Sequence, residues 1–175
     1  CAKKGAMLTC MCFGVKPEEF PFVPGETLDL AVTLEAREFR GEAQLTVSVR
    51  EVKLSGLDMD QCIHTYRVYE KLQRGEALSR EEGEELLPTR QDLAALYRKL
   101  ASLKGAAFGL QSLLGALPGF NLGKLLLCLE MLQERRLIAL LGGEQRKTAE
   151  LLPTQGKVDI FASPVYGRAK QLAEN

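Results

Sequence analysis

Two segments near the start of the chain alternate between apolar and polar residues. Leucine and valine alternate with aspartate, alanine and threonine over residues 28–34, and with threonine, serine and arginine over residues 45–50. A period of two residues is typical of strands that bury one face. The polar link between the segments contains Gly41, which supplies the positive φ that hairpin turns often need. The pattern therefore predicts an antiparallel hairpin of long strands over residues 25–52.

The chain around this hairpin contains one further expected strand and then changes to helical spacing. Residues 7–15 are predicted as a strand, and residues 16–25, with three prolines, as a loop. Residues 62–73 are compatible with a strand that turns into a helix. Beyond them, apolar residues recur every three or four positions, and Ser79 and Thr89 each precede an acidic residue by three positions, as helix N-caps do. The expected helices cover residues 76–87, 89–104, 107–117, 121–136 and 164–175.

A second hairpin is predicted after three of these helices, with the polar tip GGEQRKT at residues 142–148. Three helices followed by a hairpin is the layout of a winged helix-turn-helix. The third helix of such a domain reads DNA with polar side chains, whereas residues 121–136 are rich in leucine. Three roles stay open for this part of the chain: packing, contact with DNA phosphates through Arg146 and Lys147 at the tip, and docking of a partner protein.

Composition and charge narrow the possible functions. The chain has 175 residues, of which 46% are hydrophobic, so one or two domains with buried cores are expected. Its 23 basic and 23 acidic residues cancel, which excludes nucleic-acid binding through bulk charge alone. We found no run of apolar residues that approaches a membrane span, no signal peptide and no CxxC pair among the five cysteines. We therefore expect a soluble, cytoplasmic protein without membrane contact.

A search for catalytic chemistry yields little. The single histidine, His64, has no second histidine beside it and is interpreted as structural, and no serine has a histidine base. Cys10 and Cys12 lie on one side of an expected strand, where packing is favoured over zinc binding because two further ligands at a matching spacing are absent. The carboxylates of EEGEE, residues 81–85, are typical of a solvated helix face. We predict no catalytic residue, no metal site and no cofactor in this chain.

The predicted first hairpin also carries a family resemblance. The strings LDLAVTLE (residues 28–35), Arg-Gly (residues 40–41) and QLTVSVREV (residues 44–52) resemble the last strands of the oligonucleotide-binding (OB) domain of the RecJ family, bacterial exonucleases that degrade single-stranded DNA from its 5′ end. KKGAMLTCMCFGV at residues 3–15 is similar to the preceding family strands. PTRQDLAALYRKL at residues 88–100 is similar to the start of the C-terminal domain in RecJ proteins of the Firmicutes type.

The resemblance implies an α+β fold in two parts. Residues 1–60 would be a partial OB-fold β-barrel that lacks its first strand, residues 61–87 a connecting segment, and residues 88–175 a mostly helical, winged-helix-like domain. RecJ proteins cleave phosphodiester bonds with two metal ions, Mn²⁺ or Mg²⁺, held by an Asp-His-His motif that this sequence lacks. The chain is therefore expected to be a non-catalytic C-terminal part, with the catalytic core upstream, of an enzyme of DNA repair and recombination.

The resemblance also implies a site for single-stranded DNA. An OB sheet stacks bases on aromatic rings and places cations near phosphates. Phe39 could equally anchor the core, and the neighbouring glutamates would repel phosphates unless they face away. A stand-alone nucleic-acid or protein adaptor, and a winged-helix regulator that binds duplex DNA, remain alternative functions. The candidate DNA-binding residues are Arg37, Phe39, Arg40, Arg50 and Lys53, with Arg90, Arg98, Arg146 and Lys147 as secondary basic candidates.

Overall fold

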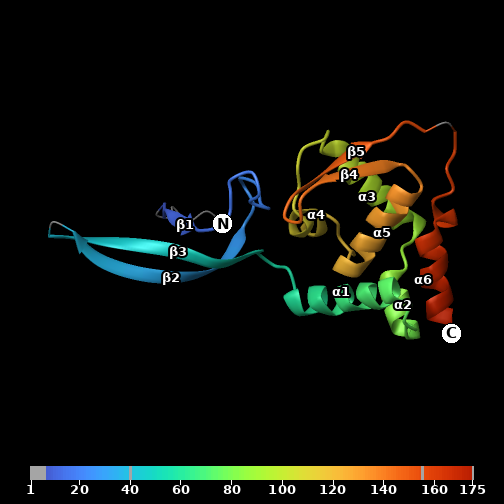
Figure 1. Ribbon diagram of the computed structural model, residues 1–175, viewed down its shortest axis with the longest axis horizontal. Helices are drawn as coiled ribbons and strands as arrows, with labels where there is room; N and C mark the ends of the chain where they lie inside the picture. Colours follow the sequence, from blue (N-terminus) through green and yellow to red (C-terminus); the bar gives the residue numbers. More distant parts are fainter. Residues whose placement is uncertain (1–6, 40, 155, 175) are drawn as a thin grey trace.

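The computed structural model describes residues 7–39, 41–154 and 156–174 and has a mixed α+β fold. A three-stranded sheet with a long hairpin extends away from a body made of helices and a short second hairpin (Figure 1). Within the described residues, none of the helices combines the length and the apolar character needed to cross a bilayer.

The three-stranded sheet contains the predicted hairpin. Strands β2 (Leu28–Phe39) and β3 (Glu42–Leu54) pair antiparallel from end to end, which confirms the prediction made from the period-two pattern. Strand β1 (Cys10–Cys12) pairs in parallel with β3, so the order is β1-β3-β2. It is shorter than the predicted strand at residues 7–15, and the chain turns directly after it, where Gly14 has a φ of +79°.

One residue of β3 has no partner on β2. Ala31 pairs with Glu51 and the next residue, Val32, pairs with Val49, so Arg50 is the extra residue of a β-bulge. The bulge brings the apolar residues of the two strands onto one face of the sheet. That face is partly open: Leu30, Val32, Leu34 and Leu45 are between 40% and 60% exposed, whereas Val47, which pairs with Leu34, is buried. The described strands form an open sheet.

The helical body contains the remaining elements. The segment around Cys62 is helical throughout, so the expectation of a strand that turns into a helix is wrong. Asp58 accepts a hydrogen bond from the backbone N of Gln61 and begins the helix, and its buried residues recur at helical spacing. The elements are α1 (Met59–Arg74), α2 (Arg80–Leu86), α3 (Arg90–Ser102), α4 (Leu110–Gly115), α5 (Leu122–Glu134), β4 (Ile138–Gly142), β5 (Lys147–Leu151), the 3₁₀ turn η1 (Ile160–Ala162) and α6 (Pro164–Glu174).

The predicted helix caps are confirmed. The hydroxyl of Ser79 accepts from the backbone N of Glu82 at 3.1 Å, and the Glu82 carboxylate accepts in return from the backbone N of Ser79 at 2.8 Å. Thr89 and Asp92 form the same reciprocal pair at the start of α3. These caps satisfy amide groups that a helix N-terminus leaves unpaired, so the starts of both helices are set locally.

Helix α5 is the centre of the body. Helices α1, α2 and α6 pack around it, and it leads into strand β4 (Figure 1). At its start, Gly123 lies against α1 so closely that an added Cβ would be 2.3 Å from the carbonyl oxygen of Thr65. Its fully buried side chains are those of Leu125, Leu127, Cys128, Leu129, Met131 and Leu132.

The sheet and the helical body meet at α4. The Gln111 side-chain oxygen accepts from the backbone N of Leu54 at 2.8 Å, and the hydroxyl of Ser112 donates to the carbonyl of Pro21 at 3.4 Å. An added Cβ at Gly115 would lie 2.4 Å from a methyl group of Leu54. The end of β3 and the loop before β2 therefore rest on one short helix.

Candidate nucleic-acid interface

The base of the first hairpin contains a cavity of about 740 Å³. It lies between the segment that follows β1 and the strands β2 and β3, close to their junction with α4. It contains aromatic rings and two basic side chains. The lining residues that carry these groups are Phe13, Phe20, Phe22, Arg50 and Lys53.

The aromatic side chains differ in position and exposure: Phe13 directly follows β1, and Phe20 and Phe22 lie in the proline-rich loop. Phe22 is buried, and the ring of Phe20 packs edge-on against it with the centroids 5.7 Å apart. Phe13 is 71% exposed. Phe22 therefore anchors the loop, whereas the ring of Phe13 has a free face, which is what stacking on a base requires.

Arg50 is the cation best placed for a phosphate. The bulge sets it outside the ladder, and its Nε donates to the hydroxyl of Thr33 at 2.9 Å. Among the described residues, no carboxylate lies within ion-pair distance of its guanidinium. The N–H groups of the two terminal nitrogens therefore stay available to a ligand. A planar guanidinium with free donors suits a phosphate group.

Lys53 is less free than Arg50. Its Nζ lies 3.6 Å from an oxygen of Asp29, the residue directly opposite it on β2. Both side chains are between 40% and 49% exposed, so this pair contributes only about 0–1 kcal/mol and a phosphate would compete for the lysine. Asp29 and Glu51 also line the cavity. The cavity therefore has mixed charge, and its positive side lies at Arg50.

The other residues predicted at the hairpin fall at its far end. Arg40 lies outside the described residues, and so do the side chains of Arg37 and Phe39. Their assignment to a DNA site stays a prediction. Of the neighbouring glutamates, Glu35 and Glu38 are exposed.

Three of the four secondary basic candidates donate hydrogen bonds to backbone carbonyls of the helical body. Arg98 donates from Nε to the carbonyl of Ala94 one turn earlier, and Lys147 donates to the carbonyl of Gly143. The half-buried Arg146 donates to the carbonyl of Ala107 at 3.1 Å and links the β4–β5 hairpin to the loop before α4. Arg90 lines a different cavity, beside α3. The structure does not gather these four residues around the base of the first hairpin.

The polar groups of α5 contact neighbouring helices. The hydroxyl of Tyr69 and the amide of Gln73, both on α1, donate to one oxygen of Glu130 at 2.7 Å. Burial first, and then the hydrogen bond to Glu130, raise the pKa of Tyr69. Asn121 caps α5 and donates to the carbonyl of Glu85. Helix α1 therefore covers one side of α5.

Groups with potential for catalysis are dispersed. His64 and Glu85 approach to 3.4 Å on an exposed surface. Burial raises the pKa of the Cys62 and Cys128 thiols, which makes both poor nucleophiles. Within the described part of the chain, no three His, Cys, Asp or Glu side chains gather in a way that would hold a metal ion.

Sequence reasoning missed the contribution of the loop before β2 to this cavity. None of Phe13, Phe20 and Phe22 is among the residues predicted from the sequence to bind DNA. The available signal was the occurrence of three phenylalanines within ten residues, of which Phe20 and Phe22 lie beside prolines in a loop that could not join a ladder.

Comparisons of the chain with models of protein families, with curated proteins and with solved structures found no match.

Proposed function

We propose that this chain is the non-catalytic, single-stranded-DNA-binding C-terminal part of a RecJ-like 5′-3′ exonuclease that acts in the cytoplasm in DNA repair and recombination. The observation that carries the proposal is the cavity at the base of the first hairpin, where an exposed aromatic ring and an unpaired guanidinium lie beside a β-sheet. Proteins that bind single strands without sequence preference combine these groups, and stacking contributes about 1–3 kcal/mol per base.

The strand topology supports the OB part of the proposal. An OB barrel is a five-stranded, partly open Greek-key barrel. In this proposal, strands β1, β3 and β2 would supply three of its five strands. In this proposal the open apolar face, which contains Leu34 and Leu45, is the inside of the barrel, and further strands would cover it.

The order of elements supports the winged-helix part. Helices α3, α4 and α5 are followed by the β4–β5 hairpin, and Phe108, just before α4, pairs with Lys147 on β5 through two backbone hydrogen bonds of 2.8 and 2.9 Å. This is the layout of a winged helix. Because α1 covers α5, we assign this part to packing and to docking of a protein partner. The Mn²⁺ or Mg²⁺ that the resemblance implies would belong to a catalytic core outside these residues.

Fluorescence anisotropy with a labelled oligo-dT strand tests the proposal. Two variants are expected to weaken binding: Arg50→Ala alone, and the triple alanine variant of Arg37, Arg40 and Arg50. The slope of log affinity against log salt concentration should become shallower by about 0.7 for each lost phosphate contact. Phe13→Ala is expected to weaken binding with little change in slope. Arg80→Ala, which removes an exposed arginine from α2, is the control of equal charge.

Unchanged binding in the Arg50 and Phe13 variants would remove the cavity from the site. A preference for duplex DNA with base specificity would support the winged-helix regulator and refute the single-strand proposal.

A protein adaptor without nuclease activity is a second candidate, favoured by the open apolar sheet face. Exposed apolar surface of this extent marks interaction sites. Absence of any single-strand binding, together with a protein partner that protects the strands of this face from hydrogen exchange, would favour it over the DNA-binding function.

A further inference from the structure

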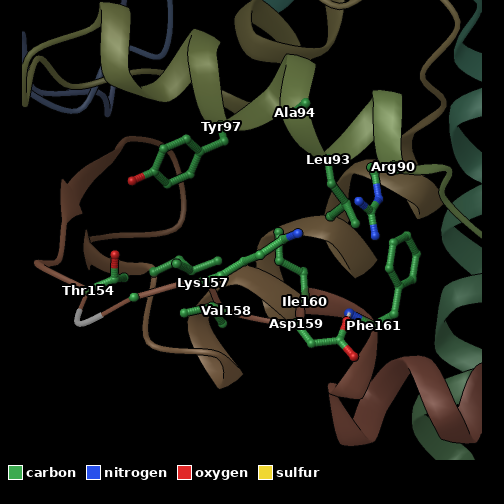
Figure 2. Close-up of a pocket in the computed structure, with 12 residues that line it drawn as sticks. Arg90, Leu93, Ala94, Tyr97, Thr154, Lys157, Val158, Asp159, Ile160 and Phe161 are labelled. Atoms are coloured by element: carbon green, nitrogen blue, oxygen red, sulfur yellow. Dashed lines mark hydrogen bonds between the residues drawn. The ribbon is translucent and has the colours of Figure 1, made fainter.

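A second cavity, of about 580 Å³, lies in the helical body between α3 and the segment that precedes η1 (Figure 2). On the helix side it is lined by Arg90, Leu93, Ala94 and Tyr97. These residues recur at the i, i+3, i+4 and i+7 positions, so a single face of α3 looks onto the cavity. The opposite wall consists of residues 154 and 156–161, which form the loop that leads into η1 and the start of η1 itself.

Apolar side chains form the floor of this cavity. Leu93 and Leu137 are buried, and the ring of Tyr97 extends from α3 toward the opposite wall (Figure 2). The wall is attached at both ends. The backbone N of Leu152 donates to the carbonyl of Leu137 at 3.0 Å, and the ring of Phe161 packs edge-on against Tyr166 with centroids 4.9 Å apart.

Two cations extend into this space. Arg90 from α3 and Lys157 from the opposite wall both direct their nitrogen atoms between the two elements (Figure 2). Within the described residues, neither has a carboxylate within ion-pair distance. The carboxylate that lines the cavity, Asp159, accepts from the backbone N of Phe161 at 3.1 Å and begins η1. Two unpaired positive charges thus stand over an apolar floor.

We propose that this cavity binds a small amphipathic anion, a ligand with a compact apolar or aromatic body and one phosphate or carboxylate group. The volume lies in the range of about 300–1,000 Å³ that small-molecule sites occupy, and such sites combine an apolar lining with a few polar groups that orient the ligand. Arg90 and Lys157 bind the anionic group, and the side chains around Leu93 and Tyr97 contact the body. Nucleotides and fatty acids share this chemistry.

Calorimetric titration of the whole chain tests the site with three probes: thymidine monophosphate, decanoate and inorganic phosphate. We expect saturable binding of at least one amphipathic probe and much weaker binding of inorganic phosphate. The Arg90→Ala/Lys157→Ala variant should lose affinity at least about tenfold, since hydrogen bonds to charged groups are the stronger ones. Ala94→Trp, which fills the cavity from an exposed position on α3, should abolish binding.

Arg98→Ala, on α3 but outside the cavity lining, is the matched control and should bind as the parent chain does. Circular dichroism verifies that each variant is folded. Binding of the nucleotide alone identifies a nucleotide source for the ligand, and binding of decanoate alone a lipid source; both support the site. Equal affinity for inorganic phosphate, binding that survives Ala94→Trp in a folded protein, or no binding of either amphipathic probe would overturn it. The oligo-dT titration of Arg50→Ala is independent of these results.

Discussion

The contact of Gly123 with α1 leads to a sharp prediction about the coverage of α5. In Gly123→Ala, the new methyl group would meet the Thr65 carbonyl oxygen at 2.3 Å and a methyl group of Leu86 at 3.2 Å. Ordinary contacts of a Cβ begin at 3.4 Å. The carbonyl belongs to the backbone of α1, so no side-chain rotation relieves the clash, and α1 and α5 must separate by about 1 Å.

The expected magnitude follows from two destabilising effects and one stabilising effect. Overpacking of this kind costs about 1–3 kcal/mol, and separation of the helices weakens the 2.7 Å hydrogen bond between Tyr69 and Glu130 by up to about 1 kcal/mol. Alanine returns at most about 1 kcal/mol through its higher helix propensity. We therefore expect Gly123→Ala to lower the free energy of unfolding by about 2 kcal/mol and the melting temperature by roughly 5 °C or more.

Urea denaturation followed by circular dichroism at the helical signal measures this change. Gly167→Ala on α6 is the matched control, because an added Cβ there meets no atom within 4 Å and the residue is exposed. It should raise the stability by about 0.5–1 kcal/mol. If Gly123→Ala were as stable as the parent chain while Gly167→Ala behaved as expected, α1 would not lie on α5. The inference that α1 prevents α5 from contacting duplex DNA would then fail.

Two further predictions concern pH. The folded-state pKa of Tyr69 lies above its ordinary value of 10.0, so its contribution to stability is complete below pH 10.0 and is lost as the pH rises through the folded-state pKa. Tyr69→Phe should lower the free energy of unfolding by about 1 kcal/mol at pH 7, and it should flatten the loss of stability at alkaline pH that urea titrations measure. The 2.5 Å hydrogen bond from Lys71 lowers the pKa of Glu82 below its ordinary value of 4.5. Glu82→Gln, which keeps the helix cap, should be less stable than the parent chain by about 0.5–1 kcal/mol at neutral pH, and this difference should vanish as the pH falls below 4.5. A difference that persists in acid would refute the ionic origin.

Residue patterns alone were sufficient for the elements whose cause is local. The alternation of residues 28–34 and 45–50 identified the first hairpin, and Ser79, Thr89 and Pro164 identified the starts of three helices, because strand period and helix caps depend on neighbours within a few positions. The segment after Asp58 was predicted wrongly, since a short stretch with β-branched residues is ambiguous until its N-cap and its packing partners are known.

Tertiary structure decided what depends on residues far apart in the chain. The parallel pairing of β1 with β3 joins positions more than thirty residues apart, and the bulge at Arg50 follows from register across two strands rather than from any local motif. The cavity at the first hairpin needs Phe13 and Arg50 brought together by that pairing, and the cavity beside α3 needs the segment around Lys157 to cross Arg90. Long-range contacts of this kind arise because separate apolar faces must be buried together, and no short window of sequence contains both partners.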